Sequence, residues 1–96
     1  MYFNMEYKQL EKISKALGDS TRLKILMKIG KCTGSLQCAD IMNMTQLAQP
    51  SVSHHIKTLI EAELILPEKV GRNYSYILNK PLLTNYLLTI GELVEK

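Results

Sequence analysis

The chain has 96 residues, of which 46% are hydrophobic, and it carries a formal net charge of +3. A chain of this length forms one domain, and the composition excludes a disordered protein. The mildly basic charge permits nucleic-acid binding without requiring it. The N-terminus lacks the basic and apolar segments of a signal peptide, and no apolar run is long enough to span a membrane. We therefore expect a cytoplasmic protein.

Three helices are predicted in the first half of the chain. Residues 4–17 place apolar side chains at helical spacing, and Gly18 favours the end of that helix. Asp19 or Ser20 then caps a second helix, which ends at Gly30, and a third helix runs from about residue 36 to residue 44. The predicted inward-facing residues are Leu10, Ile13, Ala16, Leu17, Leu23, Ile25, Leu26, Ile29, Leu36, Ala39, Ile41 and Met44.

The fourth predicted helix, residues 49–61, is the most informative segment. Pro50 suits its first turn, because the N–H that proline lacks would be unbonded there. Val52, Ile56 and Leu59 recur at helical spacing and predict a buried stripe. The remaining surface is short, polar and free of carboxylates, since no acidic residue lies between positions 40 and 61. Such a surface can approach the edges of DNA bases.

The period changes after the fourth helix. Residues 64–69 and 73–78 have the β-branched and aromatic content of strands, and residues 70–72 join them into a hairpin. Pro67 is tolerated only at a sheet edge or a bulge. A last helix starts at Asn79 or Lys80 with Pro81 in its first turn. Its wide apolar stripe comprises Leu82, Leu83, Tyr86, Leu87, Ile90, Leu93 and Val94.

Two helices joined by a tight turn, followed by a hairpin, predict a winged helix-turn-helix in a single domain, mainly α with a small β-hairpin. At this point the chain resembles the ArsR/SmtB family of bacterial winged-helix repressors. Three segments carry the resemblance: KALGDSTRLKIL at residues 15–26, QPSVSHHIKTLIEAELI at 49–65 and GRNYSYIL at 71–78. The resemblance implies a sequence-specific DNA-binding regulator, most often a repressor. We expect it to be a homodimer joined through its first and last helices, on an operator that is an imperfect inverted repeat of double-stranded DNA.

Nine residues are predicted to contact DNA. Glutamine can bond adenine in two places, and lysine favours phosphates. The hairpin tip would reach the minor groove, which attracts arginine at narrow A·T tracts. The resemblance also implies that His54 faces the DNA while His55 packs within the domain. The set comprises Gln49, Ser51, Val52, Ser53, His54 and Lys57 from the fourth helix and Arg72, Asn73 and Tyr74 from the hairpin.

The sequence departs from the family at three points. Ala48 stands where many relatives place a serine cap before the fourth helix. Gln37 and Ala39 stand where metal-sensing relatives carry a Cys-x-Cys pair, and residues 80–96 contain no His, Cys or Asp. The chain is therefore predicted to lack both of the family's metal sites, and we predict no cofactor.

Two alternatives remain open at this stage. Cys32 and Cys38 are six residues apart and could form a redox or persulfide switch, or they could be small buried apolar residues. The winged helix could also bind protein rather than DNA, because a fold does not fix a function. No nucleophile–base pair, phosphate loop or carboxylate dyad is visible, so catalysis is not expected.

Overall fold

The computed structural model describes residues 5–31 and 36–95, and it leaves the side chains of residues 36–39, 70 and 73 undescribed. The fold is mainly helical with a small antiparallel sheet, as the sequence predicts. In chain order the elements are α1 (Tyr7–Leu17), α2 (Ser20–Lys31), β1 (Leu36–Gln37), α3 (Cys38–Thr45), α4 (Gln49–Glu61), β2 (Ile65–Val70), β3 (Asn73–Leu78) and α5 (Lys80–Gly91).

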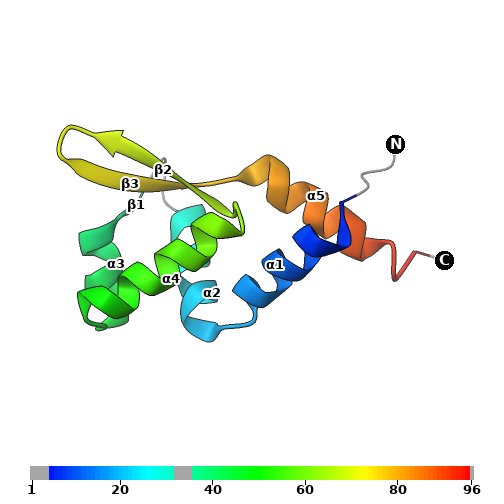
Figure 1. Ribbon diagram of the computed structural model, residues 1–96, viewed down its shortest axis with the longest axis horizontal. Coiled ribbons are helices and arrows are strands. Elements are labelled where there is room, and N and C mark those ends of the chain that lie inside the picture. The colour runs from blue at the N-terminus through cyan, green and yellow to red at the C-terminus, as the bar shows by residue number, and fades with distance from the viewer. Residues whose placement is uncertain (1–4, 32–35, 96) are drawn as a thin grey trace.

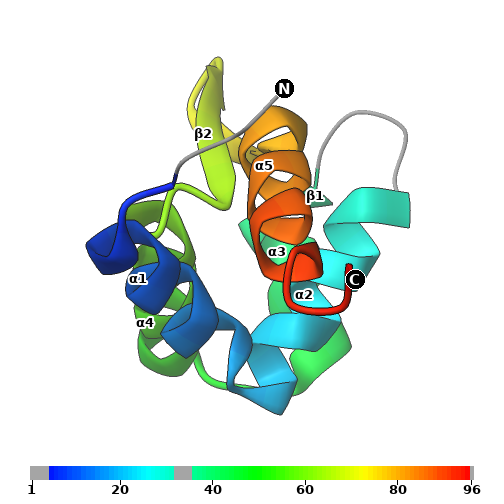
Figure 2. The same ribbon diagram turned by 90° about the vertical axis from the view of Figure 1, so that its right-hand side faces the viewer.

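The molecule is elongated, with principal extents of 46 × 24 × 21 Å. Figure 1 shows that its two ends differ. The β2–β3 turn and the start of α4 lie at one end, whereas α1, α5 and both chain termini lie at the other. Figure 2 looks at the second end and shows α1 and α5 side by side with an open space between their ribbons. A cleft lined by Met5, Tyr7, Leu10, Ile90 and Leu93 occupies this region.

The core is formed where α1, α2, α3 and α4 meet the start of β2. Burying a side chain of this size contributes about 1.5–3 kcal/mol relative to leaving it exposed. The largest fully buried side chains come from all of these elements, so the helices hold one another in place. These side chains are Ile13, Ile25, Ile41, Val52, Leu59, Leu64 and Ile65.

The sheet has one strand more than the sequence predicts. The predicted third helix began at Leu36, but Leu36 and Gln37 form β1, which pairs antiparallel with β3 opposite Tyr76 and Ser75. Two residues carry no readable alternation, so pattern alone does not identify such a strand. The strand order is β1-β3-β2, which places Pro67 on an edge strand as predicted.

Four other details correct the predictions. α1 begins at Tyr7, three residues later than predicted. Leu23 was assigned to the core but is 43% exposed on the outer face of α2. α2 continues through Gly30 to Lys31, and α5 ends at Gly91, so Leu93 and Val94 lie beyond the last helix. Periodicity locates the centre of a helix better than its ends, because the last turn frays.

The helix starts differ in their caps. The Asp19 carboxylate accepts the N–H of Arg22 at 3.0 Å and so caps α2. The Asn79 side chain accepts the N–H of Leu82 at 3.4 Å, and its amide donates to the carbonyl of Glu63 at 2.8 Å. Ala48 occupies the corresponding position before α4 and makes no side-chain cap bond. The start of α4 therefore lacks a stabilising bond that α2 and α5 possess.

Replacing Ala48 with serine is expected to stabilise the protein by about 1 kcal/mol, because a hydroxyl accepts one of the unbonded N–H groups in the first turn of α4. Urea unfolding of the two proteins measures the difference. Ala48→Val serves as the control, because valine offers no acceptor and should give no gain. Equal stability of the serine and valine variants would contradict this account of the cap.

Candidate nucleic-acid interface

The turn between α3 and α4 is built from residues 46–48. Gln46 has a φ of 59°, and its N–H donates to the carbonyl of Met42 at 3.0 Å. The Thr45 hydroxyl donates to the carbonyl of Ile41 at 2.8 Å and accepts the N–H of Leu47 at 3.4 Å. These local bonds end α3, and the partly buried Leu47 side chain anchors the turn in the core. The two helices are thereby joined at a fixed angle, as in a helix-turn-helix.

α4 has one buried face and one exposed face. Val52 and Leu59 are completely buried and Ile56 is 5% exposed, so the predicted stripe faces the core. The opposite face begins at the end of the molecule that also carries the β2–β3 turn (Figure 1). Its residues are exposed, and they include Gln49, Ser51, Ser53, His54 and Lys57.

The sequence predicts that Val52 contacts DNA, and its burial contradicts this prediction. Its exposed fraction is 0%, which leaves no surface for a base or a phosphate to touch. The residue instead anchors the first turns of α4 in the core. Among the described side chains of the set, Val52 is the one that burial removes.

The turn of the hairpin consists of Gly71 and Arg72, because the flanking Val70 and Asn73 pair with each other. Gly71 has a φ of +65°, which glycine adopts without strain and which suits a two-residue hairpin turn. The Arg72 side chain is exposed at this tip, and Tyr74 is 49% exposed on β3. The side chain of Asn73 lies outside the described residues.

The candidate DNA-binding surface therefore comprises the exposed face of α4 and the hairpin tip. Its described members are Gln49, Ser51, Ser53, His54, Lys57, Arg72 and Tyr74. No carboxylate lies within α4 before Glu61, at the end of that helix away from the tip. A surface with cations, hydroxyls and an amide but without carboxylates can approach phosphate oxygens without charge repulsion.

The two histidines of α4 have different environments. His54 is exposed, whereas the His55 side chain is 16% exposed, with its Nδ1 atom 3.2 Å from Arg22 Nη1 and 3.8 Å from Asp19 Oδ2. The inward position of His55 is thus confirmed. The sequence did not predict its partners, which lie 33 and 36 positions away. The sequence could have predicted one part of this arrangement. Asp19 and Arg22 have the three-residue spacing at which a capping side chain accepts a backbone N–H of its helix.

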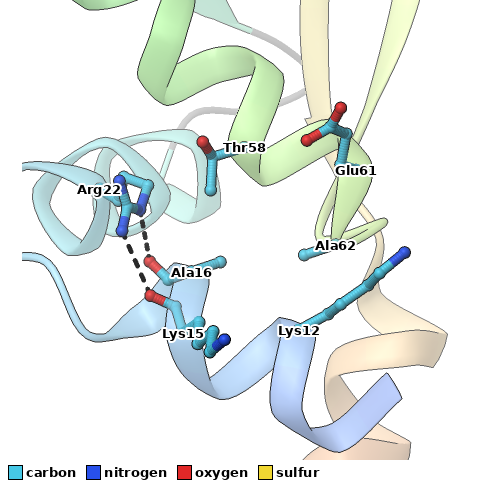
Figure 3. Close-up of a pocket in the computed structure, with 7 residues that line it drawn as sticks. All are labelled: Lys12, Lys15, Ala16, Arg22, Thr58, Glu61 and Ala62. Carbon is cyan, nitrogen blue, oxygen red and sulfur yellow. Dashed lines mark hydrogen bonds between the residues drawn. The ribbon is translucent and has the colours of Figure 1, made fainter. Parts of the chain in front are cut away.

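Arg22 also contacts the end of α1. Its Nε atom donates to the carbonyl of Ala16 at 2.8 Å, and its Nη2 atom donates to the carbonyl of Lys15 at 3.2 Å (Figure 3). The guanidinium lines a cleft of 460 Å³ between α1 and α4, with Thr58 and Glu61 on the opposite wall. The N–H donors of Arg22 bond to acceptors within the protein. We therefore interpret the cleft as a junction between helices and not as a ligand-binding cavity.

The electrostatics of this junction act on Asp19. The backbone N–H of Arg22, which bonds the carboxylate, lowers the pKa of Asp19 below its ordinary value of 3.8. The positive charge of the Arg22 side chain and the neighbouring His55 act in the same direction, against the opposing effect of burial. Asp19 therefore stays ionised at neutral pH.

The predicted thiol switch cannot be located in the structure, because Cys32 and the side chain of Cys38 lie outside the described residues. Among the side chains that the structure describes, no three of His, Cys, Asp or Glu cluster closely enough to hold a metal ion. The described helices also include none that is long and apolar enough to cross a membrane.

Comparison with known proteins gives a consistent result. The model of the bacterial regulatory protein arsR family matches residues 19–65. An arsenical resistance operon repressor of Staphylococcus aureus is 39% identical over 87 residues, which cover 91% of this chain and 82% of that protein. These relatives are regulatory proteins rather than enzymes, in agreement with the sequence prediction.

Solved structures share the fold along nearly the whole chain. The crystal structure of an ArsR family transcriptional regulator superposes with a TM-score of 0.82 at 26% identity, covering 97% of this chain and 92% of the other. A homodimeric winged helix-turn-helix DNA-binding domain from Mycobacterium bovis, solved by NMR, gives a TM-score of 0.74 at 20% identity, covering 93% and 82%. The second comparison supports the fold alone.

The lowered pKa of Asp19 predicts acid sensitivity. Because the folded value lies below the ordinary one, Asp19 stabilises the fold above pH 3.8, and this contribution is lost as the pH falls through the folded value. Asp19→Asn keeps a capping oxygen but removes the charge. The melting temperature should therefore drop less between about pH 6 and about pH 2.5 in the variant than in the wild type.

Glu68→Gln, an exposed carboxylate on β2, serves as the control for removal of one negative charge. The control should show the same melting-temperature drop as the wild type. If Asp19→Asn and the wild type lost the same number of degrees, Asp19 would not contribute to acid sensitivity.

Proposed function

This chain belongs to the arsR family of bacterial regulatory proteins, and we propose that it acts as a homodimeric repressor that reads DNA with the exposed face of α4. The observation that carries the proposal is the carboxylate-free surface of α4, beside the hairpin tip and backed by buried Val52, Ile56 and Leu59. α4 enters the major groove. Gln49, Ser51, Ser53 and His54 approach bases and phosphates there.

Lys57 and the hairpin complete the contact. Lys57, two turns along α4 from Gln49, binds a phosphate and fixes the register of the helix on the duplex. Arg72 at the hairpin tip reaches the minor groove, where narrow A·T tracts attract arginine. Asn73 and Tyr74 are secondary contacts of the same tip. Each half of the operator is then read once in the major groove and once in the adjacent minor groove.

The dimer would form through the end of the molecule that carries α1 and α5. α5 has no fully buried residue, and its apolar side chains Leu87, Leu88 and Ile90 are 60%, 48% and 39% exposed. Tyr7 at the start of α1 is 88% exposed. Apolar side chains exposed together on two neighbouring helices favour a partner surface. A similar structure, that of the Mycobacterium bovis protein, is described as homodimeric.

A two-fold dimer presents two copies of α4 to successive major grooves about 34 Å apart, so the operator is an imperfect inverted repeat. Bound there, the protein represses transcription by occluding the polymerase site. The relative from Staphylococcus aureus is named as a repressor of an arsenical resistance operon. This chain carries Gln37 and Ala39 where a Cys-x-Cys pair would bind a soft metal. We therefore propose a repressor without that metal site, whose effector acts through Cys32 and Cys38, through a small molecule, or is absent.

Removing Lys57 tests the phosphate contact. Lys57→Ala should weaken binding to every duplex about equally and reduce the salt slope of the logarithm of affinity by about 1, because one fewer counterion is released. Fluorescence anisotropy at several salt concentrations, on a duplex obtained by random-sequence selection, measures both quantities.

Lys80→Ala, at the start of α5, removes the same charge from another part of the surface and should leave the slope unchanged. Gln49→Ala, in contrast, should relax discrimination at one base pair. If the wild-type protein bound DNA without salt dependence, or bound none of the selected duplexes, the protein-binding alternative would replace this proposal.

Placing a charge on α5 tests the dimer. Leu87→Lys should raise the dimer dissociation constant by about thirtyfold or more, the effect of losing about 2 kcal/mol at the centre of an interface. Sedimentation equilibrium measures the constant. Leu66→Lys changes a leucine on β2 that is 42% exposed and should leave it unchanged. A wild-type protein that is monomeric at micromolar concentration would contradict the proposed dimer.

A further inference from the structure

One arginine joins three helices of this domain. Arg22 lies in the first turn of α2, and its guanidinium donates to the carbonyls of Lys15 and Ala16 in the last turn of α1 (Figure 3). Carbonyls at the end of a helix have no partner within the helix, and a cation is well suited to bind them. The third contact of the same group is His55 Nδ1 in α4, at 3.2 Å.

The contact between Arg22 and His55 requires one protonation state of the histidine. A guanidinium has donors and no acceptor, so Nδ1 must accept and cannot carry a proton. While this bond is formed, the imidazole is neutral and its proton is on Nε2. A protonated imidazole carries a hydrogen on both nitrogens, so it would lose this bond and would place a positive charge against the guanidinium.

A second partner is available to the protonated ring. The Asp19 carboxylate lies 3.8 Å from the same Nδ1 atom, and it already accepts the backbone N–H of Arg22 at 3.0 Å. Protonation thus replaces an Arg22–His55 hydrogen bond with a His55–Asp19 ion pair. The two states hold α4 through different groups of α2. The first uses the guanidinium of Arg22, and the second uses the carboxylate of Asp19, which caps the helix.

We propose that Arg22 is a positioning residue for DNA binding, which holds α4 against the end of α1 through neutral His55, and that protonation of His55 releases this hold and weakens DNA binding. The inference rests on the proposed function, since it assumes that α4 reads DNA. A binding constellation must be held within about 0.5 Å of its productive geometry by its supporting residues. His55 follows His54 directly in α4, so a shift of the helix at His55 also moves the adjacent DNA-facing residue.

Other charged groups around α4 must be separated from this effect. His54 is a second titratable group near His55, with its ring centroid 5.8 Å from that of His55. Lys15 forms an ion pair with Glu11 at 3.6 Å and points away from the ring's partners. The elements packed on α4 are α1, α2, α3 and β2, and besides Asp19 and Arg22 their charged residues are Lys8, Glu11, Lys12, Lys15, Lys24, Lys28, Lys31, Asp40, Glu68 and Lys69. α4 itself carries Lys57 and Glu61.

The test uses the full chain with His54→Asn, which leaves His55 as its one histidine. The affinity of this variant at about pH 8 for the selected operator duplex is the reference. Because histidine changes charge between about pH 5 and pH 8, we expect the affinity to fall roughly fivefold or more at about pH 5.5. Simple attraction of phosphates to a protonated histidine would change the affinity in the opposite direction.

His54→Asn/His55→Asn is the matched comparison. An asparagine oxygen can accept from Arg22 near the position of Nδ1 and does not titrate, so this variant should bind equally at both pH values. Arg22→Lys in the His54→Asn background should bind more weakly at pH 8 and lose the pH dependence, although its stability also changes. An affinity that does not fall at pH 5.5, or one that falls equally without His55, would overturn the proposal.

Nitrogen-15 NMR of the His54→Asn protein tests the bond without DNA. At about pH 8 the one remaining imidazole should carry its proton on Nε2. A proton on Nδ1 would exclude the contact with Arg22 and overturn the inference whatever the DNA does. If Nε2 carries the proton but the wild-type protein binds no duplex at either pH, the proposed function fails and the positioning role fails with it, while the hydrogen bond itself stands.

Discussion

The burial of one face of α4 is the constraint on which the rest of this structure depends. Val52, Ile56 and Leu59 occupy the core together with side chains from α1, α2 and α3, and this packing fixes which residues of α4 remain outside. The exposed face is polar because the apolar side chains of this stripe all point into the core. A rotation of α4 by one residue would turn the stripe by about 100° and expose the core. The hydrophobic pattern therefore determines the candidate DNA-binding surface indirectly.

The two ends of the molecule expose different kinds of surface. One end carries the start of α4 and the hairpin tip, where cations and short polar groups meet without carboxylates (Figure 1). The other carries α1 and α5, which are joined by the hydroxyls of Ser14 and Tyr86 at 2.9 Å and which leave large apolar side chains in solvent. Between them, Arg22 connects the last turn of α1 to α4. Arg22 thus gives α4 a defined contact with the end of the molecule that carries α1.

Most of the fold follows from local patterns. The bounds of α4 were predicted to the residue, because Pro50 marks its first turn and the stripe ends at Leu59. The hairpin followed from alternation around Gly71, whose φ of +65° favours glycine. β1 was missed because two residues cannot reveal a period, and its pairing partner lies some 40 positions away in β3. Leu23 was assigned to the core by residue type, although burial depends on which face the neighbouring helices cover.

The sequence by itself determined the periodic elements, the polar face of α4 and, through three motifs, the family. These features depend on the order of residues within one turn or one strand. The tertiary structure alone decided that Arg22 reaches the end of α1 and His55. It also left α5 without a buried residue. Contacts between distant segments depend on how the helices pack, and no local pattern records the distance from a guanidinium in α2 to an imidazole in α4.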